Sequence, residues 1–515
     1  MDVPTKNPAT SAVTYTADNE IQQVENPPEG ARLLQIVAKA DQLTADQPPP
    51  SKNKHKLIRV AFRVSRLMEF CSKRELENQT SHPVGDWPLV VLKELFDNAL
   101  DACEEAEVAP IIEVIVGPGF IAISDNADGI AAETIVSIIN YNVRASSREA
   151  YASPSRGQQG NALKTILAMA YVLDRERGGD INSDAVGVTI IESRGIRHRI
   201  EFRVEHIKNE PKIVHTTTPC DRTVGTKITI EWPNSAALLE YAKQRFKYLT
   251  SSYVFFNPHL SLRGVWYDKE FINIKATNPS WQKWGPRDPT SPHWYDDSRL
   301  QRYLAAHVAR DRDLGLARTV REFIAEFRGL SSTAVQRKIL AEVGCSHQSL
   351  AQFFGIDQVN RGGIAKLLAA MKRYSKPVKP QHLGIIGVDH FRQCFLAAGG
   401  NAKTFKYERR KGLTNDAIPY IIEFAFGLHQ SALEQQPATV SRRIVTGANW
   451  SVGINNPFHA FGSTGEGLES TLAKVRANAT APVICALHLA SAYVQYADRG
   501  KSSIILTDNA RQPND

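Results

Sequence analysis

A run between residues 88 and 106 places polar side chains within an otherwise apolar stretch, "LKELFDNALDA". If this run is helical, Glu94, Asn98 and Asp101 follow one another at i, i+4 and i+7, so that they share one face. Burying an unpaired carboxylate is costly, so such a face either meets solvent at the edge of the helix or has a chemical role. Both interpretations are open from this stretch alone.

Two later motifs place further polar groups at the ends of predicted strands. "SDNADGI" puts Asp125 directly after a strand and Gly129 in the turn that follows, and "VGTKITI" puts Thr226 at the start of another strand. A carboxylate in the position of Asp125 can accept a hydrogen bond from an exocyclic amine. Ordinary strand-end turns have the same composition, so neither motif is specific by itself.

A glycine-rich segment, "RGQQGNALK" at 156–164, runs into a predicted helix. Gly157 and Gly160 would allow backbone amides to approach an anion, and the N-terminus of a helix favours negative charge. A single glycine-rich turn is more often structural than functional, so the order of the motifs along the chain matters more than any one of them.

The elements that must position these residues are mixed. The sequence predicts a helix over 88–106 and a hairpin over 111–125 that bends at Gly117-Pro118-Gly119, followed by strands grouped apart from the helices. This grouping favours an α+β sandwich with helices on one sheet face. Four short amphipathic helices are predicted between 271 and 372, and mixed α/β structure after 380, with "RIVTGANWSVGI", "APVICALHLASAYVQ" and "SSIILT" as strands.

Composition sets broad limits. The chain has 515 residues, 42% hydrophobic and 23% charged, with a formal net charge of +8, which weakly favours an acidic partner such as nucleic acid. Six cysteines show no metal-ligand spacing and no apolar run is long enough to span a membrane, so we expect a cytoplasmic protein with reduced thiols and no membrane contact.

The four motifs, taken in order, resemble the nucleotide-binding domain shared by DNA gyrase, histidine kinases, mismatch-repair ATPases and the heat-shock chaperones of that class. "FRVSRLMEFCSKREL", "RASSREAYASPSRGQQGNALKT" and "LSSTAVQRKIL" are similar to the B subunit of topoisomerase VI, a type IIB DNA topoisomerase, and the resemblance spans about 57–505. It implies an α+β chain with a Bergerat-type ATPase sandwich, a helix–two-turn–helix-like domain and an α/β transducer domain. The expected boundaries are a disordered tail at 1–55, the ATPase domain at 56–270, the helical domain at 271–372 and the transducer-like domain at 373–515.

The resemblance also implies a role for each matching residue, with ATP and Mg²⁺ as cofactors. Glu94 would be the general base that polarises the attacking water, and Asn98 would hold the Mg²⁺. Asp125 would bind the adenine amino group with support from Thr226, and Gly129 would let the backbone pass close to the base.

Further nucleotide contacts would come from the segment over the phosphates and from the second domain. The expected residues of this segment are Ser146, Ser147, Gly157, Gln158, Gln159, Gly160, Asn161, Ala162, Leu163 and Lys164. Lys501, in "DRGKSS", would reach the γ-phosphate as the switch lysine of the transducer. A P-loop at this lysine is disfavoured because Gln495 stands where that motif needs a glycine.

The sequence departs from the family pattern at two glycines and at its C-terminal end. Ala127 and Ala162 replace two family glycines, and the long helix with which the family docks on its DNA-cleaving A subunit is not expected in the fourteen residues after Lys501. "DRD" at 311–313 resembles a metal-binding pair of a cleavage domain, but we expect a solvated charge cluster because no apolar strand precedes it.

Three hypotheses follow. The first is the ATPase subunit of a type IIB DNA topoisomerase, an ATP-dependent homodimer that acts on DNA with a separate A subunit in a heterotetramer. The second is a stand-alone ATP-driven DNA clamp or switch, in defence or repair, without strand passage. The third is a catalytically silent nucleotide sensor, suggested by Ala127 and Ala162.

Overall fold

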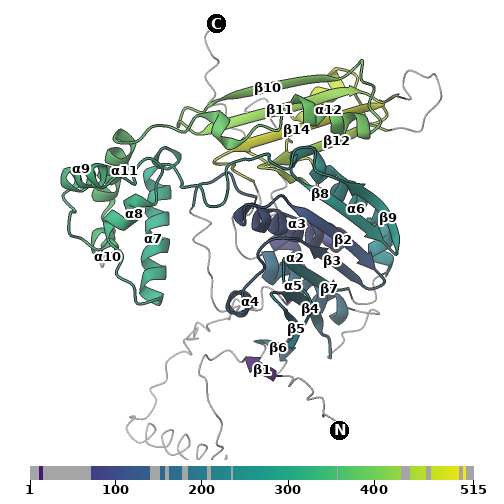
Figure 1. Cartoon of the computed structure of the whole chain (residues 1–515), viewed down its shortest axis with the longest axis horizontal. Coiled ribbons are helices and arrows are strands. Elements are labelled where there is room, and N and C mark those ends of the chain that lie inside the picture. Colours follow the sequence, from purple (N-terminus) through teal and green to yellow (C-terminus); the bar gives the residue numbers. More distant parts are fainter. Residues whose placement is uncertain are drawn as a thin grey trace, which may run out of the picture.

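The computed structural model describes residues 11–15, 71–139, 151–156, 162–176, 184–205, 210–232, 236–355, 358–430, 441–459, 466–497 and 503–505. Over these residues the protein is an α+β chain with two mixed sheets and a separate group of helices, which confirms the predicted fold class at this level (Figure 1). None of the described helices combines the length and apolar character that a membrane crossing requires.

The first sheet has nine described strands in the order β1-β6-β5-β4-β7-β3-β2-β8-β9. Their bounds are β1 (Ser11–Tyr15), β2 (Ile111–Gly117), β3 (Phe120–Ser124), β4 (Gly187–Ser193), β5 (Ile196–Glu205), β6 (Glu210–Pro219), β7 (Thr226–Glu231), β8 (Ser261–Trp266) and β9 (Lys269–Ile274). The predicted hairpin is confirmed as β2 and β3, with Gly119 at φ +81° in its turn. Only β2 and β8 pair in parallel, and the other neighbours among the described strands of this sheet are antiparallel.

Helices cover this sheet, and α3 is the central one. The helices of this part are α2 (Lys73–Thr80), α3 (Trp87–Glu105), α4 (Ala132–Ile139), α5 (Ala162–Arg175) and α6 (Ala236–Phe256). Contacts of α3 with α5, α6, β2 and β3 place it between its two neighbours on the strands. Its apolar side chains, including Trp87, Leu92 and Phe96, are fully buried in the main core, so the predicted helix is confirmed to within one residue at each end.

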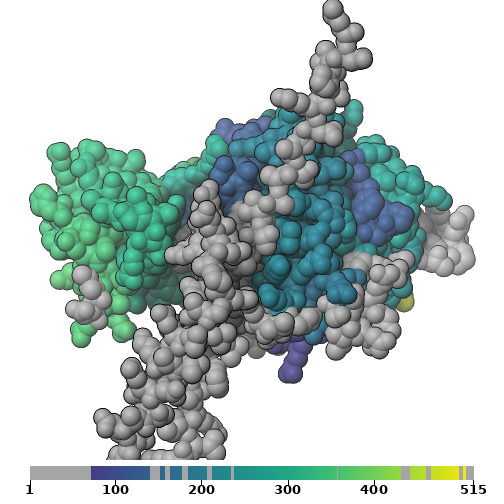
Figure 2. Space-filling model, turned by 90° about the horizontal axis from the view of Figure 1, so that it is seen from below, coloured from purple at the N-terminus to yellow at the C-terminus, as the bar shows by residue number. Residues whose placement is uncertain are grey.

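A second group of helices has its own core. It comprises the short turn η5 (Pro292–Trp294) and the helices α7 (Asp297–Asp313), α8 (Val320–Ala325), α9 (Thr333–Val343), α10 (Leu350–Phe354) and α11 (Arg361–Arg373). Buried aromatic residues such as Trp294, Tyr303 and Phe323 fill this core. The group forms a green lobe beside the teal and blue surface of the first sheet and its helices (Figure 2). The four helices predicted in this region are confirmed as α7, α8, α9 and α11.

The second sheet has the order β10-β11-β14-β12-β13 among the described residues. Its strands are β10 (Lys406–Leu413), β11 (Pro419–Leu428), β12 (Arg443–Ala448), β13 (Ser451–Val452) and β14 (Val483–Ser491), with η6 (Pro380–Leu383), α12 (Val388–Ala397) and α13 (Leu468–Lys474) beside them. Because β12 and β13 contact α6, and β13 also contacts α3, this sheet packs on the helices that cover the first sheet (Figure 1).

Within the tail predicted at 1–55, residues 11–15, "SAVTY", form β1 and pair with β6, and the remainder of that prediction lies outside the described residues. Other sequence predictions need correction. The strand predicted from "SSIILT" is wrong in its described part, because Ile504 makes only an isolated bridge to Tyr496. The solvated charge cluster predicted from "DRD" at the end of α7 is confirmed for Arg312 and Asp313, which are exposed, and is wrong for Asp311, whose carboxylate is buried 3.5 Å from the Nε of Arg318.

Candidate functional site

The carboxylate of Asp125 is held in place at the end of β3. Its Oδ1 accepts hydrogen bonds from the backbone N–H of Ala127 at 3.0 Å and of Thr226 at 3.1 Å, and its own N–H donates to the carbonyl of Thr226 at 2.9 Å. Burial raises the pKa of Asp125, and the two backbone donors oppose this shift. Its other oxygen, Oδ2, has no hydrogen-bond partner among the described residues, so it is available to an external donor.

The backbone around Asp125 requires two glycines. Gly225 has φ +74° and donates its N–H to the carbonyl of Ala127 at 2.8 Å, and a Cβ there would overlap the carbonyl oxygen of Asp125. Gly129 has φ +78°, and a Cβ there would lie 2.6 Å from the Oγ of Ser193. Ala127 is not among the residues with positive φ, so the side chain that replaces a family glycine fits without backbone strain.

The neighbour of Asp125 in the sequence ties this strand end to α3. Asn126 accepts hydrogen bonds at its Oδ1 from the N–H of Ile111 at 2.8 Å and from the thiol of Cys103 at 3.3 Å, and its Nδ2 donates to the carbonyl of Ala109 at 3.1 Å. Cys103 belongs to the last turns of α3. The Asp125 carboxylate is therefore fixed beside the C-terminal part of this helix.

Glu94 and Asn98 lie earlier on α3, where the helix reaches the surface. Glu94 is half-buried and Asn98 is exposed, and neither side chain makes a hydrogen bond to another residue that the structure describes. Nine residues separate Glu94 from Cys103, which is about 14 Å along the helix axis. The strand end that carries Asp125 thus lies near the C-terminal turns of α3, and Glu94 and Asn98 lie in earlier turns of the same helix.

Some expected site residues fall outside the part of the chain that the structure describes. These are Ser146, Ser147, Gly157, Gln158, Gln159, Gly160, Asn161 and Lys501. Ala162 begins α5, Leu163 packs against the main core, and burial lowers the pKa of the Lys164 amine. The described residues contain no group of three or more His, Cys, Asp or Glu side chains that could hold a metal ion. An exposed amide such as Asn98 suits a magnesium ion that takes most of its ligands from water and phosphate.

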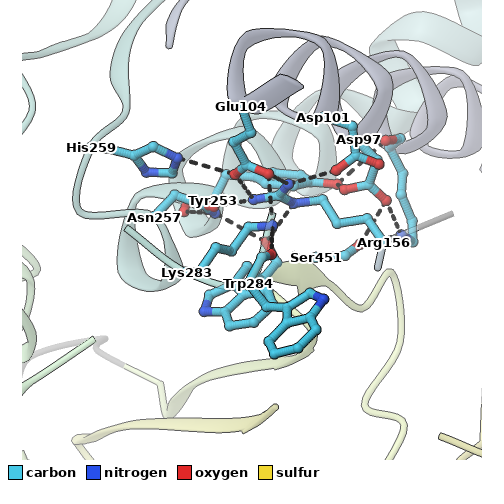
Figure 3. A network of polar contacts seen from close by, with 12 residues as sticks. Asp97, Asp101, Glu104, Arg156, Tyr253, Asn257, His259, Lys283, Trp284 and Ser451 are labelled. Atoms are coloured by element: carbon cyan, nitrogen blue, oxygen red, sulfur yellow. Dashed lines mark hydrogen bonds and ion pairs between the residues drawn. The ribbon is translucent and has the colours of Figure 1, made fainter. Parts of the chain in front are cut away.

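A buried arginine, which the sequence analysis did not single out, joins several parts of the chain (Figure 3). Arg156 is 2% exposed, and its guanidinium donates to Asp101 at 2.7 Å and to both carboxylate oxygens of Glu104, each at 2.7 Å. It also donates to the Oδ1 of Asn257 at 2.7 Å, and the Nδ2 of Asn257 donates to the carbonyl of Trp450 at 3.0 Å. The last turns of α3, the residue after α6 and the second sheet therefore meet at one guanidinium.

The charges in this network balance one another. Glu104 also pairs with the Nζ of Lys283 at 2.7 Å and lies 3.0 Å from the Nε2 of His259. Burial alone would raise the pKa of Glu104, but Arg156 and Lys283 outweigh it and hold the pKa well below the ordinary range. Glu104 raises the pKa of Arg156 in turn, against the effect of burial. A cluster with balanced charges and so many hydrogen bonds is rigid, because Arg156, Glu104 and Lys283 have lost nearly all of their water and rely on their partners.

The chain shares sequence similarity with several known proteins. No protein-family model matches the chain. The B subunit of type 2 DNA topoisomerase 6 from Archaeoglobus fulgidus is 27% identical over 298 residues, covering 55% of this chain and 44% of that protein. The protein of the same name from Thermococcus onnurineus is 26% identical over 304 residues (56% and 50%), and that from Methanosarcina mazei is 32% identical over 178 residues (33% and 27%).

Solved structures are also similar, at a lower level. The ATPase domain of Aquifex aeolicus MutL complexed with ADP matches with a TM-score of 0.30 and 12% identity, covering 79% of this chain and 91% of that one. The ATPase region of Saccharomyces cerevisiae topoisomerase II matches with a TM-score of 0.34 and 9% identity, covering 81% of this chain and 76% of that one. The chain spans about half the length of the first two topoisomerase relatives, 44% and 50%.

Proposed function

Because the chain is a distant homologue of the B subunit of topoisomerase VI, we propose that it is the ATP-binding and ATP-hydrolysing subunit of a type IIB DNA topoisomerase. Two copies would dimerise on ATP to form a clamp, and a separate A subunit would cut the DNA. The observation that carries this proposal is the Asp125 carboxylate, which is fixed by two backbone donors and leaves Oδ2 for an amine.

Adenine recognition would start at this carboxylate. Its Oδ2 would accept a hydrogen bond from the exocyclic amine of the base, which separates adenine from guanine because guanine presents a carbonyl there. Thr226 supports this geometry by donating its N–H to Oδ1, and the glycine at 129 allows close approach beside Ser193. These contacts fix the orientation of the base without taking part in the chemistry.

The chemistry would take place at the other end of the nucleotide, along α3. Glu94 would accept a proton from the attacking water and orient it towards the γ-phosphate. The Asn98 amide oxygen would be a ligand of Mg²⁺, which when bound offsets the negative charge of the phosphates. Residues 157–164, with Ser146 and Ser147, would contact the phosphates through backbone and side-chain donors, and Lys501 would approach the γ-phosphate from the second domain.

The test is Mg²⁺-dependent ATP hydrolysis by the purified chain, compared with a Glu94→Gln variant. Loss of a general base lowers kcat by about 100-fold or more, while nucleotide binding persists. Glu105→Gln is a matched control, because Glu105 is an exposed carboxylate at the end of the same helix and should retain full activity. A wild-type chain that neither binds nor hydrolyses ATP would overturn the ATPase assignment.

Dimerisation and strand passage need their own measurements. Size-exclusion chromatography with light scattering should show a dimer with a non-hydrolysable ATP analogue, in the wild type and in Glu94→Gln alike. With a topoisomerase VI A subunit added, supercoiled plasmid should be relaxed only in the presence of ATP. ATP-dependent dimerisation and capture of circular DNA without relaxation would favour the stand-alone clamp over the topoisomerase.

A further inference from the structure

A second buried ionic cluster lies on α3, one turn before the Arg156 network. Lys93 donates to the Oδ2 of Asp97 at 2.6 Å and to the hydroxyl of Ser451, and that hydroxyl donates to the same Oδ2 at 2.7 Å. The other oxygen of Asp97 accepts from the hydroxyl of Tyr253 on α6 at 2.8 Å. Lys93, Asp97 and Ser451 are 8%, 4% and 7% exposed, so water does not compete for these bonds.

The charges of this cluster depend on one another. Burial alone would lower the pKa of Lys93 and raise that of Asp97, but each is shifted the other way by its partner. Both groups are therefore ionised, and the Ser451 hydroxyl is the polar group of the second sheet that satisfies them. Lys93 and Asp97 are on the same helix, whereas Ser451 comes from a strand more than three hundred residues away. The hydrogen bond from the Ser451 hydroxyl therefore ties α3 to the second sheet.

Ser451 is held by a tight two-residue turn between β12 and β13. Asn449 and Trp450 in this turn have φ of 49° and 63°. Asparagine often adopts positive φ in such turns, whereas for tryptophan this conformation is strained. The turn is fixed from the second sheet, since the N–H of Trp450 donates to the Nε2 of His488 at 3.0 Å and the N–H of Ser491 donates to the Oδ1 of Asn449 at 2.9 Å. Such strain persists only where the surroundings determine the backbone, so the turn is a rigid support for α3.

This support acts next to the proposed reaction site. Lys93 and Asp97 directly precede Glu94 and Asn98 in the sequence, and successive residues on a helix point about 100° apart. The ionic cluster therefore faces the second sheet while the next residue of each pair turns towards the surface, where Glu94 is half-buried and Asn98 is exposed. A rotation or shift of α3 at the cluster would displace both of these side chains.

We propose that Ser451 is a positioning residue for ATP hydrolysis, through which the second sheet holds α3 at the rotation that aims Glu94 and Asn98 at the nucleotide. This inference rests on the proposed function. The Arg156 network binds the same helix one to two turns later, at Asp101 and Glu104, and Arg156 also donates to the carbonyl of Trp450. The turn Asn449–Ser451 is therefore linked to α3 directly through Ser451 and indirectly through Arg156.

The experiment compares Ser451→Ala with Ser451→Thr and Ser491→Ala in the full chain. Ser451→Ala should lower kcat by about tenfold, because a small displacement of a catalytic group is costly, while the Kd for a non-hydrolysable ATP analogue stays within about twofold. Ser451→Thr keeps the hydroxyl and should restore turnover. Ser491→Ala removes another buried hydroxyl of the second sheet, which bonds only to Tyr493 in the part described, and should leave kcat unchanged.

A second readout, amide hydrogen exchange, separates this inference from the proposed function. Faster exchange in the Glu94–Asn98 turn of Ser451→Ala, and not of Ser491→Ala, would support positioning even if the wild type proved unable to hydrolyse ATP. Unchanged exchange would overturn it, and so would, in a chain that hydrolyses ATP, an unchanged kcat in Ser451→Ala or an equal loss of kcat in both alanine variants.

Discussion

Replacing Arg156 with methionine removes a buried positive charge from between two carboxylates and retains most of the side-chain volume. In the folded protein the guanidinium makes an ion pair with Asp101 and another with Glu104, each at 2.7 Å, and its side chain is fully buried. The variant therefore replaces the hydrogen-bonded guanidinium with an apolar thioether of similar volume, and no large cavity opens.

The expected loss in the free energy of unfolding depends on which ion-pair partners each carboxylate keeps in the variant. Removing one partner of a buried ion pair costs about 3–5 kcal/mol, because the remaining charge stays buried without compensation. Glu104 keeps Lys283 at 2.7 Å and His259 at 3.0 Å, whereas Asp101 has no other ion pair among the described residues. Because the side chain of Asp101 is 21% exposed and keeps part of its hydration, we expect a loss near the lower limit, about 3 kcal/mol, carried mainly by Asp101.

The assay is urea denaturation followed by tryptophan fluorescence, with Arg263→Met as the matched control. Arg263 also has two carboxylate partners, Glu113 and Glu270, but its side chain is 49% exposed, so its loss should change the free energy of unfolding little. Adding Asp101→Asn to Arg156→Met should recover part of the stability by removing the uncompensated charge. Equal midpoints for the two methionine variants would refute the reasoning that burial makes this ion pair strong.

Two further predictions concern single residues. Gly225→Ala should weaken binding of an ATP analogue and destabilise the fold by about 2 kcal/mol or more, because its Cβ would overlap the Asp125 carbonyl, whereas Gly344→Ala, at a similar φ in open space, should cost only about 1 kcal/mol. If both variants bind the analogue and unfold alike, the close approach at Gly225 is not important. Burial lowers the pKa of His488 to about 3 from 6.5, so as the pH falls below 6.5 the unfolded chain takes up a proton that the folded chain does not, and stability falls with pH. His488→Gln should therefore flatten the pH dependence of the unfolding free energy by about 1.4 kcal/mol per pH unit between about pH 6 and pH 4, and parallel curves for the two proteins would contradict this.

The helix and the hairpin around the site could be predicted from the sequence. The 3.6-residue apolar pattern predicts α3 almost to its ends, and Gly117-Pro118-Gly119 marks the turn between β2 and β3, because both signals depend on neighbours in the chain. The strand β1 escapes prediction because five residues show too little pattern to indicate a strand that forms only by pairing with β6, some two hundred residues away.

The sequence by itself placed Glu94, Asn98 and Asp125 at a helix surface and a strand end, since spacing and motif order are local properties of the chain. The functional roles given to these residues stay predictions. The charged residues that precede Glu94 and Asn98 on α3 show a signal too, since Lys93 and Asp97 stand at i, i+4, but spacing alone cannot tell a surface pair from a buried one. Only the tertiary structure decided this. Their partners, and those of Arg156, lie up to 358 residues away, and a buried charge is stable only where the packed fold brings such distant groups within hydrogen-bond distance.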